Sequence, residues 1–242
     1  MDSHRKTAII VGVLFIIATA FLFIGEAIYN PILSSPEYLD ITYPNRIIVI
    51  LGILLEFIIV LAMPLIAVFL FPILKKHNEA LALGYVGFRF FEAVLFVVIE
   101  SNKLSLINVS KDYLNKGGVD ASYFQNIGSS IQSVNDWTFS IYVLVFTVGA
   151  LMLYFVLYKS KLIPRFISAW GFIAAAFLLI GSVLIMVEMF TGISELGLQL
   201  IFVIPIAVNE MVLAIWLIVK GFNPTAIASG LAKSDMMEGE KK

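Results

Sequence analysis

The sequence contains no cysteine, and only two of its 242 residues are histidine. The absence of cysteine excludes disulfides, thiolate metal sites and cysteine nucleophiles, and it leaves the redox compartment undetermined. His4 lies in the N-terminal tip and His77 in a predicted loop, so we expect neither a bis-histidine haem site nor a multi-histidine zinc site. The sequence therefore predicts no cofactor and no bound metal.

Charge is scarce as well. Charged residues make up 14% of the chain and the net charge is −1, whereas soluble proteins are about one quarter charged. No basic stripe of the kind that binds nucleic acid is present, and the chain has neither a Gly-x-Ser-x-Gly elbow nor a phosphate-binding loop. We therefore expect no nucleic-acid partner, and the sequence favours a protein that is not an enzyme.

The chain is rich in long apolar runs. It is 60% hydrophobic with a mean hydropathy of +0.98, and its apolar runs reach the length of about 20 residues that spans a bilayer. These features predict an all-α polytopic membrane helix bundle in residues 1–222, followed by a flexible cytoplasmic tail at 223–242. The six predicted spans are residues 7–29, 47–74, 81–100, 137–158, 166–190 and 197–220.

The long connection between the third and fourth spans, residues 101–136, has a helical pattern of its own. Asp120 is a suitable N-cap, and apolar residues recur after it at helical spacing. They are Tyr123, Phe124, Ile127, Ile131 and Val134. We expect an amphipathic outer helix on the membrane surface or against the bundle; the alternative is a solvated loop with one short helix.

Basic residues indicate the orientation, because cytoplasmic loops of membrane proteins are enriched in Lys and Arg. With the N-terminus inside, eleven basic residues fall on the inner side and four on the outer side. The outer four are Arg46, Lys103, Lys111 and Lys116. This asymmetry predicts a multi-pass protein of the cell membrane with both termini in the cytoplasm.

Several acids lie within the apolar spans, where a charge costs about 2.5–3.5 kcal/mol at a helix centre. They are Glu26, Glu56, Glu92 and Glu210, and Arg89 is the one basic residue inside a span. Such residues should face one another inside the bundle rather than face lipid. Glu100, at the outer end of the third span, is expected to be accessible to water.

The third span carries the strongest polar pattern. Tyr85, Arg89 and Glu92 share one helix face, and residues three apart can form an ion pair. One arginine neutralises one carboxylate, so Glu56, Glu92 and Glu210 leave roughly two acids that must be protonated, hydrated or paired with a cation. The candidate ligand- or proton-binding residues are Glu56, Arg89, Glu92, Glu210, Asn209, Glu26 and Tyr85.

Three functions are compatible with this cluster. The first is a binding or transport-like protein with a carboxylate and arginine pocket inside the membrane, which takes a small ligand, a cation or a proton. The second is a membrane enzyme in which glutamate acts as acid and base on a lipid or apolar substrate. The third is a scaffold held by a static charge cluster. The lipid bilayer is the expected partner, and the sequence is also compatible with a homo-oligomer.

Three segments resemble motifs of a bacterial and archaeal family of six-span membrane proteins of unknown function. The first, Phe88-Arg89-Phe90-Phe91-Glu92-Ala93, is similar to a Phe-Arg-x-x-Glu-Ala signature. The second is the segment from Leu162 to Gly171, similar to Leu-Ile-Pro-Arg-x-x-Ser-x-Trp-Gly, and the third runs from Asn209 to Phe222. The resemblance covers roughly Thr7 to Phe222 and implies the six-span topology, but it implies no substrate.

Overall fold

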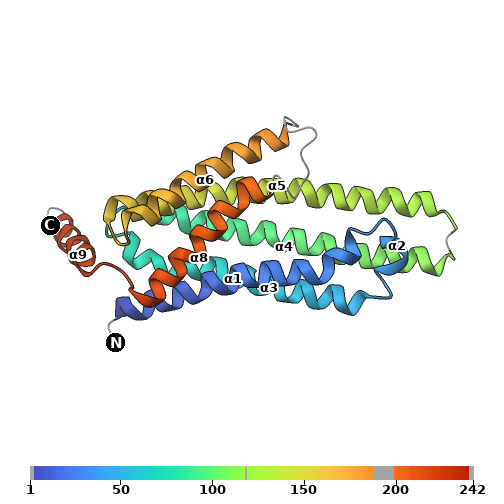
Figure 1. Ribbon diagram of the computed structural model, residues 1–242, viewed down its shortest axis with the longest axis horizontal. Helices are drawn as coiled ribbons and strands as arrows, with labels where there is room; N and C mark the ends of the chain where they lie inside the picture. The colour runs from blue at the N-terminus through green and yellow to red at the C-terminus, as the bar shows by residue number, and fades with distance from the viewer. Residues whose placement is uncertain (1–2, 118, 188–198, 240–242) are drawn as a thin grey trace. The chain divides into compact units, whose positions relative to one another are not determined.

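The computed structural model describes residues 3–117, 119–187 and 199–239, and every regular element in this part of the chain is a helix (Figure 1). The elements are α1 (Ser3–Leu33), α2 (Tyr38–Ile41), α3 (Arg46–Leu74), α4 (Glu79–Asn115), α5 (Ala121–Ser160), α6 (Arg165–Met186), the π-helix η1 (Gln199–Val203), α8 (Ile204–Val219) and α9 (Pro224–Gly239). The outer end of the fifth predicted span and the start of the sixth lie outside the described residues.

Among the described residues, six helices are long and apolar enough to cross a membrane. They are α1, α3, α4, α5, α6 and the stretch Ile201–Val219, which includes the end of η1 and all of α8. The predicted all-α bundle with six spans is therefore confirmed. The protein is a multi-pass membrane protein, and its exposed apolar side chains contact lipid.

The chain divides into two compact units. We call residues Met1–Ile16, Ala62–Glu92 and Val143–Lys242 the first unit, and residues Ile17–Leu61 and Ala93–Tyr142 the second unit. Four helices, α1, α3, α4 and α5, contribute residues to both units. Each unit has its own buried core and, as shown below, its own charged cluster.

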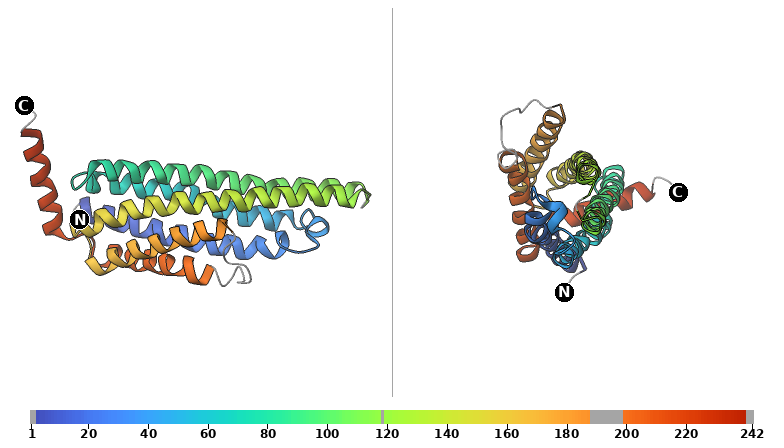
Figure 2. Two further views of the ribbon diagram at one scale, coloured as in Figure 1. Left: turned by 90° about the horizontal axis from the view of Figure 1, so that it is seen from above. Right: turned by 90° about the vertical axis from the view of Figure 1, so that its right-hand side faces the viewer.

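The core of the first unit is built from the buried faces of α1, α3, α4, α5, α6 and α8. Its largest buried members include Phe15, Tyr85, Tyr154 and Ile167. Within this unit α6 packs against α8 and η1. Figure 2 shows α6 and α8 side by side. Gly12 permits a close approach of α1 to α8, since a Cβ there would lie 2.7 Å from the carbonyl oxygen of Ala214.

The core of the second unit joins α1, α2, α3, α4 and the start of α5. Tyr29, Val49, Leu106 and Phe124 are among its buried members. A single hydroxyl anchors the α2 segment, because Ser110 Oγ donates to Leu39 O at 2.6 Å and accepts from Tyr43 N at 2.9 Å. The connection between α1 and α3 is thus tied to α4.

The segment between the third and fourth spans is helical, as expected, but it forms no separate helix. Instead α4 continues to Asn115, and α5 starts at Ala121 and continues into the fourth span. No glycine or proline occurs between Gly87 and Gly117, so nothing in the sequence stops α4 at the end of its apolar run. Gly117 then takes a φ of +61°, which ends the helix.

Two further expectations can be compared with the helices. The expected helix start at Asp120 matches, since Asp120 O accepts hydrogen bonds from Tyr123 N and Phe124 N. Of the predicted apolar face, Phe124 is buried whereas Tyr123 is exposed. In the C-terminal tail, α9 occupies Pro224–Gly239.

Candidate functional site

The strongest sequence pattern becomes a compact ion-pair cluster in the first unit. Tyr85, Arg89 and Glu92 are one turn apart on α4, and Glu210 comes from α8. The Arg89 guanidinium donates from Nη1 to Glu92 Oε2 at 2.9 Å and from Nε to Tyr85 Oη at 3.1 Å. Its Nη2 lies 3.6 Å from Glu210 Oε1. We call these four residues the Arg89 cluster.

The two carboxylates of the Arg89 cluster are held differently. The Glu92 side chain is fully buried and hydrogen-bonded, whereas the Glu210 side chain is 14% exposed. A separation of 3.6 Å is an ion pair but is longer than a good hydrogen bond. Glu92 is therefore fixed by the guanidinium, and Glu210 is the more loosely held and more accessible acid.

Aromatic rings surround the guanidinium where water would otherwise lie. The Arg89 Cζ is 5.4 Å from the ring centroids of Tyr85 and Phe146 and 6.0 Å from that of Phe15. Such contacts stabilise a desolvated cation by up to about 2 kcal/mol. They offset part of the cost of burying Arg89, which is only 4% exposed, and they leave the guanidinium edge for the carboxylates.

Three buried oxygens at or beside the cluster have no hydrogen-bond partner among the described residues. They are Glu92 Oε1, Asn209 Oδ1 and Tyr154 Oη. Asn209 uses its amide nitrogen to donate to Ile167 O at 2.9 Å, so only its oxygen is left. Tyr154 belongs to the same site electrostatically, since it interacts with Glu210, Tyr85 and Arg89. Glu92 Oε1 and Asn209 Oδ1 can only accept hydrogen bonds, whereas the Tyr154 hydroxyl can also donate one, so the three unpaired groups offer two obligate acceptors for a single donor.

Glycines on α5 and α6 make room beside these oxygens. A Cβ at Gly171 would collide with the Tyr154 ring and with Asn209 Oδ1, and a Cβ at Gly149 would lie 3.3 Å from Glu92 Oε1. Both glycines therefore bring bare backbone against the unpaired acceptors. Neither offers a side chain that could donate a proton to them.

The backbone that leads to Glu210 is irregular. η1 has π-helical hydrogen bonding and passes directly into α8, where Pro205 stands in the first turn. Single π-turns inside longer helices occur frequently at functional sites, and a proline removes one backbone donor. Asn209 and Glu210 follow Pro205 by four and five residues, so both lie on α8 within about two turns of the π-helix.

The structure contains a second charged cluster, in the second unit. Lys103 Nζ donates to Glu56 Oε2 at 2.7 Å, to Glu100 Oε1 at 2.9 Å and to Tyr29 Oη at 2.6 Å. Tyr29 Oη in turn donates to Glu56 Oε1 at 2.9 Å. We call these four residues, which come from α1, α3 and α4, the Lys103 cluster.

The Lys103 cluster is tightly closed. All three ammonium protons have acceptors and both oxygens of Glu56 are bonded; only Glu100 Oε2 lacks a partner among the described residues. Gly25 and Gly52 allow the approach of α1 to α3 that this geometry needs. A Cβ on Gly25 would lie 2.5 Å from Glu56 Cγ and 2.8 Å from Gly52 O.

The structure thus brings some of the predicted site residues together and separates others. Arg89, Glu92, Glu210 and Tyr85 form one cluster with Asn209 beside it, whereas Glu56 is buried as expected but pairs with Lys103. The expectation that Arg89 gathers all the acids is therefore corrected, because the acids lie around two separate cations, Arg89 and Lys103. The remaining candidate, Glu26 on α1, is half-buried and interacts electrostatically with Tyr29.

Sequence reasoning missed Lys103, Glu100 and Tyr29. Lys103 was assigned to the outer loop and Glu100 to water because the apolar run ends near residue 100, yet both are buried. The signal that could have identified them is their spacing of three residues on a helix with no stop residue, which places a carboxylate and an ammonium on one face.

Neither cluster resembles a metal site. No group of three His, Cys, Asp or Glu side chains in the described part of the chain is placed to hold a metal ion. The chemistry within reach of the Arg89 cluster is therefore that of carboxylates, an amide oxygen and a phenol: accepting a proton, or accepting hydrogen bonds from a cationic or neutral donor.

The comparisons with known proteins identify a family but no activity. No curated protein and no solved structure matches the chain. One family model does, and it spans most of the sequence, from the first apolar helix to the end of the sixth span. The chain belongs to the DUF4386 family, a domain of unknown function matched over residues 10–221.

Proposed function

We propose that the protein is a binding or transport-like membrane protein whose site for a proton or a cationic group is the Arg89 cluster. The observation that carries the proposal is the surplus of buried acceptors there. Glu92 Oε1 and Asn209 Oδ1 have no donor among the described residues, and Glu210 has only a long contact to Arg89. A proton or an ammonium-like ligand supplies the missing donors.

Charge supports the same conclusion. Two carboxylates share one guanidinium in the Arg89 cluster, which leaves one negative charge when both are ionised. An uncompensated charge in hydrocarbon surroundings is costly. Uptake of one proton or one cation makes the cluster neutral, so the site is poised for one positive charge.

Glu210 is the group that exchanges in this proposal, and Arg89 with Tyr85 positions it. Glu92 is held at 2.9 Å and buried, while Glu210 is held at 3.6 Å and is partly exposed. The π-helix before α8 allows Glu210 to move with its helix. Asn209 and Tyr154 would orient the incoming donor.

Infrared spectroscopy and thermal unfolding of the purified protein test the proposal together. In the wild type, lowering the pH should produce a protonated-carboxyl C=O band that Glu210→Gln removes and the exposed control Glu79→Gln keeps. Sodium, potassium and choline chloride, compared at constant ionic strength, reveal whether a cation stabilises the folded protein. If Glu210→Gln keeps both the wild-type carboxyl band and the wild-type response to cations, the proposal is contradicted.

We also propose that the protein lies in the cell membrane with both termini in the cytoplasm. The support is that the first unit carries the N-terminus, the C-terminal residues and most of the basic residues near span ends, while the second carries Arg46, Lys103, Lys111 and Lys116. The chain has no cysteine, so single cysteines can be labelled cleanly. An impermeant maleimide applied to intact cells should label Asn115→Cys and not Lys75→Cys; the reverse pattern would invert the topology.

A further inference from the structure

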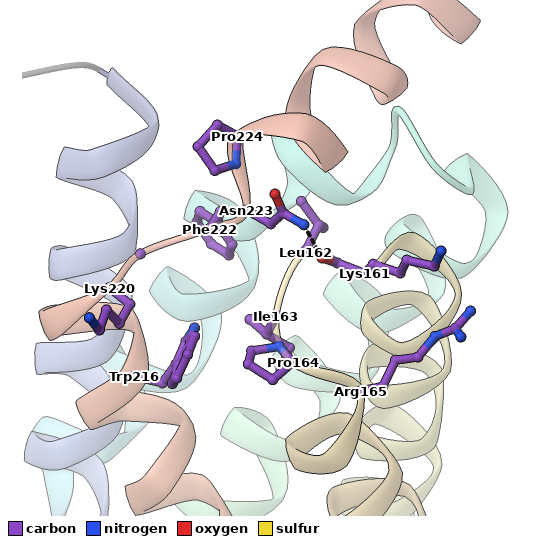
Figure 3. Close-up of a pocket in the computed structure, with 11 residues that line it drawn as sticks. Lys161, Leu162, Ile163, Pro164, Arg165, Trp216, Lys220, Phe222, Asn223 and Pro224 are labelled. Atoms are coloured by element: carbon purple, nitrogen blue, oxygen red, sulfur yellow. Dashed lines mark hydrogen bonds between the residues drawn. The ribbon is translucent and has the colours of Figure 1, made fainter.

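A pocket of about 490 Å³ lies in the first unit, where the connection between α5 and α6 meets the connection between α8 and α9. Figure 3 shows Lys161 and Arg165 at one rim of it and Lys220 at the opposite rim, with their charged ends directed outward and with Trp216 and Phe222 between them. None of these residues belongs to the Arg89 cluster or the Lys103 cluster. The pocket is therefore a separate feature.

Two loops are tied together to form this pocket. Asn223 N donates to Leu162 O at 2.9 Å, and Asn223 Nδ2 donates to Lys161 O at 3.3 Å. The chain turns at Lys161 and at Gly221, which have φ values of +59° and +75°. These turns and hydrogen bonds preform the pocket, so a ligand need not order it.

The pocket is strongly basic. Its eleven lining residues include Lys161, Arg165 and Lys220, and they include no acid. In the described residues none of the three cations forms an ion pair with a carboxylate, and Arg165 instead lies 5.3 Å from the centroid of the Tyr158 ring. Three exposed cations without counter-charges at the rim of one cavity favour an anionic ligand that lies at its mouth.

The backbone adds to this preference. Helix α6 begins at Arg165, on the pocket wall, and its N-cap residue Pro164 makes no side-chain capping bond. The amide groups and dipole at such a helix start attract anions. The anion-binding character thus comes from two independent sources, the side chains and the start of a 22-residue helix.

The location indicates which anion. The pocket lies where two membrane spans meet water, at the start of α6 and just beyond the end of α8. Trp216 and Phe222 give it apolar and amphipathic walls, as is typical of the membrane interface. Basic pockets between spans are known to take phospholipid headgroups. We propose that this pocket binds the phosphate-bearing headgroup of an anionic phospholipid.

Native mass spectrometry of the purified protein in detergent tests this proposal, with titrations of phosphatidylglycerol, phosphatidylcholine and inorganic phosphate. The variant combines Lys161→Gln, Arg165→Gln and Lys220→Gln. The matched control combines Lys6→Gln, Lys75→Gln and Lys159→Gln, which removes the same charge from the same unit outside the pocket. The pocket variant should bind phosphatidylglycerol about a hundredfold more weakly, since each cation near a lipid surface contributes about fivefold.

The control variant should retain wild-type affinity, and phosphatidylcholine should bind equally weakly to all three proteins. If the triple variant does not fold, Lys220→Gln alone, at an exposed position, should weaken phosphatidylglycerol binding about fivefold. Equal loss in both triple variants would mean a general charge effect and would overturn the pocket. Binding of inorganic phosphate with no preference for the anionic lipid would overturn the lipid assignment.

Discussion

The two charged clusters contain the same kinds of groups, but the Lys103 cluster is more completely hydrogen-bonded than the Arg89 cluster. Each has one cation, two glutamates and a tyrosine that bonds to the cation. In the Lys103 cluster every ammonium proton is used and both acids lie within 2.9 Å of the nitrogen. In the Arg89 cluster one acid stands off at 3.6 Å and unpaired acceptors lie beside it.

This difference separates a structural role from a binding role. The Lys103 cluster leaves only one acceptor, Glu100 Oε2, without a partner among the described residues, and a nearly complete buried network of this kind serves to hold helices in register. An incomplete network keeps buried acceptors without donors, and a ligand or a proton can supply the missing donor. We therefore expect substitutions in the Lys103 cluster to reduce stability, and substitutions of Glu210 to change binding while sparing the fold.

Removing the cation of the closed cluster should have the largest effect on stability. Lys103→Met leaves Glu56 and Glu100 buried without a counter-charge, which typically costs about 3–5 kcal/mol. Unfolding in detergent, followed by circular dichroism during heating or dodecyl sulfate titration, measures this loss. Lys111→Met, at an exposed position on the same helix, should be nearly neutral. If the two variants are equally stable, the Lys103 cluster does not support the fold.

Removing one acid from the closed cluster should cost less but remain clear. Glu56→Gln keeps the shape but replaces one carboxylate oxygen with an amide nitrogen, so the negative charge is lost together with the acceptor for either Lys103 or Tyr29. Bonds to charged groups contribute about 1.5–3 kcal/mol each. The same unfolding assay should therefore show a loss of about 2 kcal/mol. A triple variant with Lys103→Met, Glu56→Gln and Glu100→Gln should be more stable than Lys103→Met alone, because it leaves no buried charge.

Sequence patterns predicted the parts of this molecule that depend on one helix at a time. Span positions follow from apolar length, and the pairing of Arg89 with Glu92 follows from their spacing on one helix. The partner of Glu56 could not be predicted in this way, since it depends on how α1, α3 and α4 pack. The burial of Lys103 could not be predicted from apolar length either, because α4 continues past its apolar run and carries this residue into a buried position.

The glycines beside the two clusters allow the packing of the clusters to be compared. Gly25→Ala would press a methyl group against Glu56 Cγ and the backbone oxygen of Gly52, at 2.5 and 2.8 Å, and such overpacking costs about 1–3 kcal/mol. Gly149→Ala would meet its nearest atoms, in Phe88 and Glu92, at 3.1 and 3.3 Å. Thermal unfolding should therefore place Gly25→Ala below Gly149→Ala in stability. The reverse order would show that the closed cluster tolerates expansion better than the open one.

Among Lys103→Met, Glu56→Gln, Gly25→Ala and Glu210→Gln, the last should have the smallest effect on stability. Its contact to Arg89 is long, and its removal leaves one carboxylate beside one guanidinium, so no buried charge is left without a partner. Glu92 remains bonded to Arg89, so the guanidinium keeps a counter-charge. The unfolding midpoint should stay close to that of the wild type while the proton- or cation-dependent signal disappears. A loss as large as that of Glu56→Gln would mean that Glu210 is a structural acid as well, and the contrast between the two clusters would fail.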